Sequence, residues 1–501
     1  MRNHQEDYSD LHKVSREIRI LDGIHSLLDW DQETYMPSGA APIRAEQFKT
    51  LAEIIHKKKT SGPFLKTLSK LVDLKTGKMI AKGLSAAQTA ALSEWHRDYK
   101  KEKVLPKSFV SNWAQLTSQG VHAWRHAKEQ DAFNQFSPYL EKIVGLARKK
   151  AEYLGYKSHP YDALLDLYEP GTTYKDLSIL FKHLRTELTA LLKKIKAQKP
   201  VDDSFLFGTF PKEQQLEFGH ALLTALGYSS DHGRLDLSSH PFSSAAHPSD
   251  SRITTRIHPN SLMSNISAVM HEAGHALYEM GLPQEQYGTP LGDAISLGMH
   301  ESQSRWWETR IGHSKPFWKH FLPVLKQHFK TLDDIKLDTF YHALNKVKPG
   351  LIRIEADEVT YCLHVILRFE LEYALIDGSL KVRDLPEAWN AKMKELLGVV
   401  PSNNREGCLQ DIHWSMGAIG YFPTYALGNL YAAQLFAAFT KEHADWESRV
   451  AKGELLFIKD WLSKAVYQHG RRYSSQELIQ LVTKKPISAN DYIDYLNNKY
   501  R

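Results

Sequence analysis

The chain has 501 residues, of which 42% are hydrophobic and 24% are charged, a composition that excludes a disordered or fibrous protein and allows a large buried core. Its 64 basic and 58 acidic residues give a formal net charge of +6 and are scattered along the chain, which excludes the concentrated basic surface of a nucleic-acid-binding protein. The chain has two cysteines, and its N-terminus is charged where a secretory leader would be apolar, so we expect a reducing compartment.

Most of the sequence has the apolar periodicity of amphipathic helices. Apolar residues recur at spacings of three and four in segments such as 108–130, 177–198 and 358–376. No βαβ alternation, glycine-rich phosphate loop or internal repeat occurs, and no linker of flexible composition separates two regions. The pattern predicts a mainly α-helical protein with a single domain over residues 1–501, in which residues of about 1–205 and 206–501 form two lobes around a cleft.

A segment near the middle of the chain interrupts the helical pattern. Residues 238–262 are rich in serine, proline and β-branched residues, and the run RITTRI alternates as a β-strand does. The sequence therefore predicts a short β-hairpin or small sheet directly before the next helix.

That next helix carries the motif HEAGH. Residues 268–281 read AVMHEAGHALYEMG, and the helix is expected to begin near Ser264 or Asn265 and to end at Gly281. His271 and His275 are four residues apart, so both imidazoles project from one helix face and can bind one metal ion. The motif predicts two metal ligands.

Glu272 occupies the position of a catalytic base. As the neighbour of the first histidine, it can reach a water on the metal without being a ligand, take its proton during attack on a carbonyl, and pass that proton to the leaving amine. Gly274 costs about 0.5–1 kcal/mol relative to alanine inside a helix, which indicates close packing against another element. A surface helix with two solvated histidines is the alternative, but the apolar surroundings favour a metal site, since buried polar groups need partners.

A third protein ligand has to come from further along the chain. A metzincin arrangement is excluded, because Tyr278 and Gly281 stand where that pattern requires a glycine and a histidine. Glu301 and Glu308 share a face of the helix expected around residues 299–312, and either can bind the metal or hydrogen-bond a ligating histidine. Spacing alone does not choose between them. The other downstream carboxylates are Glu279, Glu285 and Asp293.

The stretch from Trp414 to Thr440 carries no charge and passes a simple length test for a membrane span. Pro423 and several glycine and amide residues argue against a span, so we expect no membrane insertion. The pattern predicts a buried loop followed by a buried helix from about Tyr425.

Six motifs, taken in order, resemble the carboxypeptidase Taq family of metallocarboxypeptidases, peptidase family M32. They are HPF at 240–242, DxRxT at 250–254, HExxH at 271–275, HESQ at 300–303, IRxxAD at 352–357 and GxxQDxHW at 407–414. The N-terminal stretch LLDWDQETYMPSGAAPIRAEQ and the later stretch GYFPTYALGNLYAAQ are also similar to the family. The resemblance therefore spans nearly the whole chain.

The resemblance implies a fold, an activity and a ligand set. It implies Glu301 as the third metal ligand beside His271 and His275, in a two-lobed helical fold with a deep cleft, similar to neurolysin-like and angiotensin-converting-type peptidases. It also implies a cytoplasmic, homodimeric carboxypeptidase that uses zinc, with cobalt as a substitute. Such an enzyme removes single C-terminal residues from peptides with a free C-terminus, with broad specificity but disfavouring proline.

A carboxypeptidase has to recognise a free α-carboxylate, and the planar fork of arginine can bind both of its oxygens. Arg353 is the preferred candidate for this anchor and Arg252 the second. Each has a structural alternative, an ion pair of Arg252 with Asp250 or of Arg353 with an acid of the EADE run.

Other polar residues are candidates for contacts to the substrate or to the ligands. His413, Tyr421 and Tyr425 are candidate donors to the oxyanion that develops during the reaction. His240 is a candidate contact to the substrate backbone, and a core histidine is its alternative. Asp357 is a candidate for holding His271 or His275 in the required tautomer, a role for which Asp250 and Asp411 compete.

Two further hypotheses stay open at this point. The same scaffold suits a dipeptidyl carboxypeptidase or an oligo-endopeptidase, which differ from a carboxypeptidase in the bond they cut. A hypothesis of another class is a catalytically silent, metal-stabilised interaction protein, although its expected damage to the motif glutamate or to a ligand is not found.

Overall fold

The computed structural model describes residues 3–60 and 62–500 as a set of helices around one small sheet, which confirms the prediction of a mainly α-helical protein. The helices are α1 (His4–Thr34), α2 (Ala41–Lys59), α3 (Gly62–Leu71), α4 (Ala86–Lys103), α5 (Lys107–Gln130), α6 (Phe133–Leu154), α7 (Pro160–Leu165), α8 (Tyr174–Lys196), α9 (Lys212–Ala225), α10 (Leu262–Met280), α11 (Leu297–Arg305), α12 (Lys315–His328), α13 (Leu337–Leu344), α14 (Tyr361–Asp377), α15 (Leu385–Leu397), α16 (Pro423–Glu442), α17 (Trp446–Val450), α18 (Leu456–Ala465), α19 (Ser475–Thr483) and α20 (Asn490–Lys499). The strands are β1 (Leu235–Leu237), β2 (Ser243–His247) and β3 (Asp250–Thr255).

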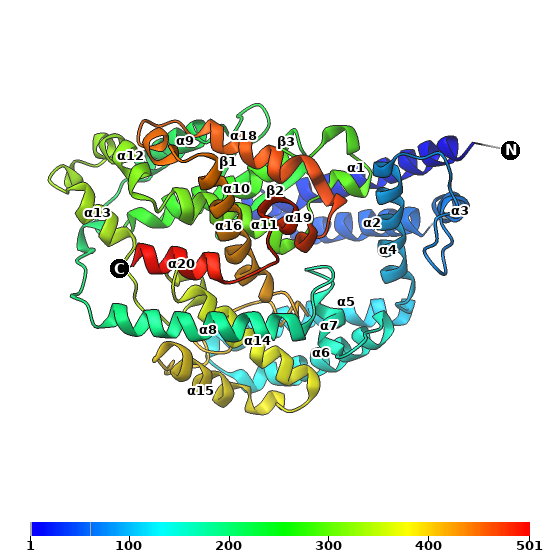
Figure 1. Cartoon of the computed structure of the whole chain (residues 1–501). Helices are drawn as coiled ribbons and strands as arrows, with labels where there is room; N and C mark the ends of the chain where they lie inside the picture. The colour runs from blue at the N-terminus through cyan, green and yellow to red at the C-terminus, as the bar shows by residue number, and fades with distance from the viewer. Residues whose placement is uncertain (1–2, 61, 501) are drawn as a thin grey trace.

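Buried apolar side chains form two clusters. The smaller cluster joins α1, α2, α3 and α4, which lie together at one end of the molecule (Figure 1), and takes in Leu291 from the rest of the chain. The larger cluster runs from Ala127 to Leu496 and surrounds α10, α11 and α16 in the middle of the molecule. The N-terminal helices therefore have a core of their own, and the division into lobes near residue 205 stays a prediction.

The sheet confirms the predicted hairpin and adds a strand. Strands β2 and β3 pair antiparallel, with Ser243 opposite Ile253, and β1 pairs parallel to β3 on its other side. Strand β1 has only three residues, too few for an alternating pattern to be visible. Helix α1 packs on β2 at Gly23, where a Cβ atom would lie 2.6 Å from the carbonyl oxygen of Ala246.

Helix α10 begins earlier than predicted. Its N-cap is Ser261 rather than Ser264 or Asn265, while Gly281 is the C-cap as expected. Asn265 is fully buried and is held by other partners, because its side chain accepts a hydrogen bond from Thr255 and donates one to the backbone of Gln215. A residue whose side chain is committed to tertiary contacts is not available to cap a helix.

The uncharged segment near the C-terminus forms a buried helix inside the protein. Helix α16 begins at Pro423, two residues before the predicted start, and packs against α11, α14, α19 and α20. Among the described residues, no helix is long and apolar enough to cross a membrane. The interpretation of this segment as a buried loop followed by a buried helix is confirmed.

A buried ion-pair network attaches the last helix to the rest of the fold. The Glu358 carboxylate bonds Lys499 of α20 at 2.7 Å and also pairs with Arg310. Burial opposes ionisation of Glu358, but the two cations lower its pKa from 4.5 to about 2. Since the pKa is depressed in the folded state, this carboxylate stabilises the fold at neutral pH and loses that contribution as the pH falls from about 4.5 towards 2.

Replacing Glu358 with glutamine is expected to lower the stability at pH 7 by about 3 kcal/mol, because two buried cations lose their counter-charge. The difference from the native protein should narrow as the pH falls below about 4.5, where the native carboxylate also becomes neutral. Denaturant midpoints at pH 7, 5, 4 and 3 measure this. Glu355→Gln, at an exposed position three residues earlier, is the matched control, and a penalty that does not change with pH would contradict the prediction.

Candidate metal-binding active site

Three predicted ligands converge on one point. The ligand atoms of His271 and His275 on α10 and of Glu301 on α11 all lie within 4.8 Å of one another. Nε2 of His271 and Nε2 of His275 each lie 3.7 Å from Oε2 of Glu301. The helix places the two imidazoles on one face, and the third ligand reaches them from the neighbouring helix.

The donor set fits a divalent cation such as zinc. Tetrahedral bonds of about 2.0–2.1 Å place ligand atoms about 3.3 Å apart, slightly less than the 3.7 Å between Oε2 of Glu301 and Nε2 of either histidine. Two imidazoles and one carboxylate are the ligands of a catalytic zinc site, which leaves a fourth position open. Nδ1 of each imidazole has its own partner in the protein, so Nε2 is the nitrogen free to bind the metal.

Two glycines hold the ligand helix in place. A Cβ atom at Gly274 of α10 would lie 2.5 Å from the carbonyl oxygen of Gln303 in α11. On its other side, a Cβ atom at Gly428 of α16 would lie 2.5 Å from Cγ of Glu301. These approaches confirm the close packing expected at Gly274 and show that α11 is clamped between α10 and α16.

Glu308, the other candidate ligand from the sequence, contacts the first proposed ligand, His271, on the side of the ring that faces away from the metal-binding nitrogen. Its Oε2 lies 2.8 Å from Nδ1 of His271 and accepts a hydrogen bond of 2.7 Å from Arg305. Glu308 belongs to a π-helical segment, η5 (Trp306–Ile311), that continues α11. Burial would raise the pKa of Glu308, but Arg305 and His271 lower it to about 2.

The second ligand has a different outer partner. Nδ1 of His275 lies 2.6 Å from Nδ1 of His300, and Nε2 of His300 lies 2.9 Å from Oε1 of Glu279. Asp357, predicted as a candidate for this role, is not in contact with either ligand. Its carboxylate instead accepts hydrogen bonds from the turn that starts α14, at Val359 and Thr360, and that prediction was wrong.

The electrostatic environment suits the role predicted for Glu272. This side chain is 7% exposed, and within the described ranges no hydrogen bond occupies its carboxylate. Burial and the nearby carboxylates of Glu301 and Glu308 raise its pKa to about 7, although His271 opposes the shift. A base with a pKa near the working pH both accepts and releases a proton efficiently.

The first ligand binds a proton strongly when no cation is present. Burial lowers the pKa of His271, but Glu301 and Glu308 outweigh that effect and raise the pKa to about 9. An imidazole has to lose this proton before it can bind a metal, so metal binding releases protons and weakens as the pH falls.

A second polar cluster contains the predicted substrate-binding arginine. The Arg353 guanidinium bonds Asp411 through Nε and one terminal nitrogen at 3.1 and 2.9 Å, and its other terminal nitrogen donates to the Tyr361 hydroxyl at 3.2 Å. Asp411 is also paired with Arg368, so two guanidiniums share one carboxylate. The ion-pair partner of Arg353 is therefore Asp411 and not an acid of the EADE run.

The predicted histidine and tyrosines join the same cluster. Nε2 of His413 lies 3.1 Å from the Tyr425 hydroxyl, and the Tyr421 ring packs on both residues. The guanidinium of Arg353 lies 4.7 Å from the centre of the Tyr425 ring. Burial lowers the pKa of His413 to about 3, so its imidazole stays neutral at pH 7.

Tyr361 connects this cluster to the metal-binding residues. Its hydroxyl receives the bond from Arg353, and the Arg305 guanidinium lies 5.0 Å from the centre of its ring. Arg305 in turn bonds Glu308, the partner of His271. Tyr361, Arg305 and Arg368 carry no motif that marks them in the sequence. Only the helical spacing of Arg305 and Glu308 signals one of them.

The two remaining candidates lie in and beside the sheet. Arg252 on β3 forms an ion pair with Asp250 through two hydrogen bonds of 2.7 and 3.0 Å, which is the structural role considered for it above. Its guanidinium also lies over the Trp30 ring. His240 lies exposed in the turn before β2, which excludes a core histidine. The structure thus brings Arg353, His413, Tyr421 and Tyr425 together and leaves Arg252 and His240 outside that cluster.

Comparison with known proteins agrees with this arrangement. The family model described as carboxypeptidase Taq (M32) metallopeptidase matches residues 10–500. Thermostable carboxypeptidase 1 of Thermus thermophilus is 41% identical over 98% of both chains, and carboxypeptidase 1 of Bacillus subtilis is 39% identical over 95% of this chain and 94% of its own. The crystal structure of an M32 carboxypeptidase from Deinococcus radiodurans superimposes with a TM-score of 0.95, at 36% identity and over 99% of both chains.

Proposed function

The chain belongs to the carboxypeptidase Taq (M32) metallopeptidase family and is a metallocarboxypeptidase, and on this premise we propose that it uses zinc to remove single C-terminal residues from peptides. We also propose His271, His275 and Glu301 as the metal ligands and Glu272 as the general base. The observation that supports this assignment is the convergence of three ligand atoms within 4.8 Å beside a buried glutamate that has no hydrogen-bond partner among the described residues. Cobalt is proposed as a substitute metal.

The proposed mechanism divides the work among the residues of the two clusters. When bound, the cation supplies Lewis acidity, which polarises the scissile carbonyl and acidifies an attacking water. Glu272 takes the proton of that water and passes it to the leaving amine, a task that its raised pKa supports. Glu308 and His300 hold the ligating imidazoles in orientation through their Nδ1 atoms.

Substrate recognition is assigned to the cluster around Arg353. Two guanidiniums and one carboxylate leave the cluster with a surplus positive charge, which favours a bound carboxylate. The terminal nitrogen of Arg353 that bonds Tyr361 carries a second N–H group, and we assign this group to the substrate C-terminus. His413, Tyr421 and Tyr425 are proposed to donate to the developing oxyanion. Arg252 and His240 remain weaker candidates for contacts further along the peptide.

The family resemblance is also the basis for three further proposals. These are a broad specificity that disfavours proline, a homodimeric state and a cytoplasmic location. Two rival activities suit this scaffold, the release of C-terminal dipeptides and internal cleavage. The reaction products distinguish both of them from the release of single residues.

A peptide mixture incubated with the enzyme is expected to give a ladder of single-residue C-terminal losses by mass spectrometry. A chelator should stop the ladder, and added Zn²⁺ should restore it, because hydrolysis needs the cation. Dipeptide losses or internal fragments would instead assign one of the rival activities, and a ladder unaffected by a chelator would contradict the metal-dependent mechanism.

A further inference from the structure

Among the described residues, the second proposed ligand is linked by hydrogen bonds to a carboxylate that lies outside the metal site. His275 contacts His300 through the two Nδ1 atoms at 2.6 Å, and His300 contacts Glu279 through Nε2 at 2.9 Å. The side chains of His275, His300 and Glu279 are 17%, 20% and 16% exposed, so all three groups are largely withdrawn from solvent. The inference that follows rests on the proposed role of His275 as a ligand.

The direction of these hydrogen bonds is determined by the last member. An ionised carboxylate only accepts hydrogen bonds, whereas a neutral imidazole donates from one nitrogen and accepts at the other. Glu279 therefore requires a donor at Nε2 of His300, which leaves Nδ1 of His300 as an acceptor. His275 must then donate from Nδ1, and its Nε2 keeps the lone pair that a metal needs.

This tautomer agrees with the geometry of the site. Nε2 of His275, the nitrogen left without a proton, is the one that lies 3.7 Å from the Glu301 carboxylate. With the opposite direction, the proton of His275 would sit on Nε2 and occupy the metal-binding position. His271 does not need such a chain, because its Nδ1 meets the Glu308 carboxylate directly.

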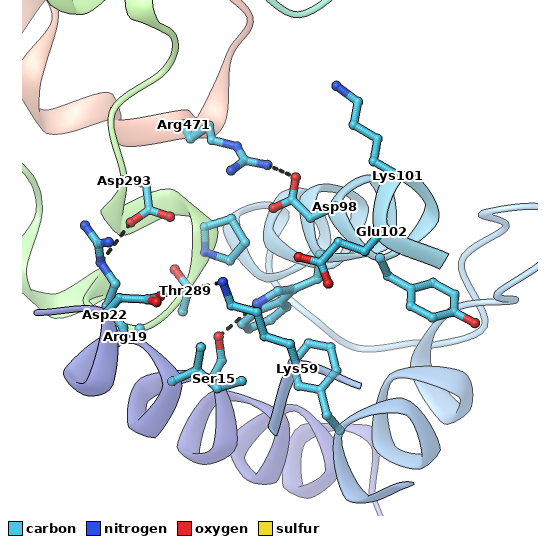
Figure 2. Close-up of a pocket in the computed structure, with 16 residues that line it drawn as sticks. Ser15, Arg19, Asp22, Lys59, Asp98, Lys101, Glu102, Thr289, Asp293 and Arg471 are labelled. Carbon is cyan, nitrogen blue, oxygen red and sulfur yellow. Dashed lines mark hydrogen bonds and ion pairs between the residues drawn. The ribbon is translucent and has the colours of Figure 1, made fainter. Parts of the chain in front are cut away.

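A cation from the N-terminal helices helps to keep the terminal carboxylate ionised. Burial raises the pKa of Glu279, but its interactions with His300 and, to a smaller extent, the charge of Arg19 outweigh burial and lower the pKa. Arg19 lies on α1, with its Nε 3.3 Å from Asp293. Arg19 and Asp293 line a cavity of about 350 Å³ between α1, α4 and residues 288–293. Figure 2 shows these two side chains on its wall.

We propose that His300 and Glu279 are positioning residues that set the metal-binding tautomer of His275. Neither residue touches the reacting atoms, so their effect is expected in metal affinity and not only in the rate of hydrolysis.

Glu279→Gln tests the direction of the chain without changing its shape. A glutamine amide can present either its oxygen or its NH₂ group to His300, so both directions become accessible and part of the protein holds His275 in the wrong tautomer. Affinity for Zn²⁺ is expected to fall about tenfold, the lower end of the effect of outer partners on metal affinity. His300→Leu removes the acceptor itself and is expected to cost up to about a hundredfold.

The measurement is a titration of Zn²⁺ into chelator-treated protein in competition with a chromophoric chelator. Glu285→Gln, an exposed change of the same chemistry, is the control for Glu279→Gln.

Equal Zn²⁺ affinities of Glu279→Gln and Glu285→Gln would overturn the inference. Glutamine has the size of glutamate, so Glu279→Gln decides the matter even if His300→Leu fails to fold. The unfolding midpoints of the metal-free proteins verify that Glu279→Gln has folded. His275→Ala separates the two proposals. If that variant binds Zn²⁺ as tightly as the native chain, the proposed ligand set fails, whatever the result at Glu279.

Discussion

Glu272→Gln is expected to lower kcat by about 10³-fold, within the range of general acid–base catalysis, while the protein still binds one equivalent of Zn²⁺. Glutamine has the size of glutamate but cannot take a proton from the attacking water. The site already places this carboxylate beside His271, almost fully buried and without a competing hydrogen bond among the described residues. Loss of hydrolysis with retained metal would therefore assign the proton transfer to this residue.

The pH dependence gives a second view of the same group. Burial raises the pKa of Glu272 to about 7 in the metal-free site, and a bound cation shifts it downwards, since positive charge favours the ionised form. Because a base works only when ionised, kcat/KM of the native, metal-loaded enzyme should decline on the acid side, with its midpoint at a pH below 7. Glu285→Gln should leave both kcat and the profile unchanged, and near-native hydrolysis by Glu272→Gln would refute the proposed mechanism.

Arg353→Gln is expected to lower kcat/KM for a peptide with a free C-terminus by about 10²- to 10³-fold. Removing one partner of a buried charge pair commonly costs about 3–4 kcal/mol, and each 1.4 kcal/mol corresponds to a factor of ten. Asp411 retains its ion pair with Arg368 in this variant, so no unpaired carboxylate is left in the cluster. The fold is expected to survive, which makes the kinetic result interpretable.

A peptide and its C-terminally amidated twin make the test specific for the carboxylate. The native enzyme should strongly prefer the free acid, and Arg353→Gln should lose most of that preference while its slow turnover of the amide stays the same. Arg252→Gln is the matched comparison, because Arg252 is the other sequence candidate and is paired with Asp250. A larger loss of preference in Arg252→Gln would move the anchor to β3, and unchanged preference in both variants would exclude either arginine as the anchor.

The extent to which sequence predicts this molecule depends on the range of the interactions involved. The pairing of His271 with His275 follows from helix geometry alone, because residues four apart share a face. The small sheet and the buried segment before α16 were likewise visible as local patterns of alternation and proline. In each case the relevant neighbours lie within a few residues of one another in the chain.

The residues that contact the ligating histidines and Arg353 come from distant parts of the chain, and local patterns do not predict most of them. Asp357 was expected to hold a ligating imidazole, but its carboxylate binds the backbone at the start of α14. Glu308, which the sequence offered for either role, contacts His271, and His300, which was not a candidate, contacts His275. Arg353 finds its counter-charge 58 residues later, at Asp411. Such pairings depend on how α11, α14 and the loop before α16 pack, and nothing in the local pattern determines that.

The glycine clamp around α11 has a consequence for the order of events in the cell. Glu301 is held from one side by α10, which precedes it, and from the other by Gly428 of α16, which follows it by more than a hundred residues. During synthesis on the ribosome, the three proposed ligands emerge well before the helix that fixes the third. A nascent chain therefore has all of its ligands but no rigid site, and we expect metal capture to be a late, post-translational step.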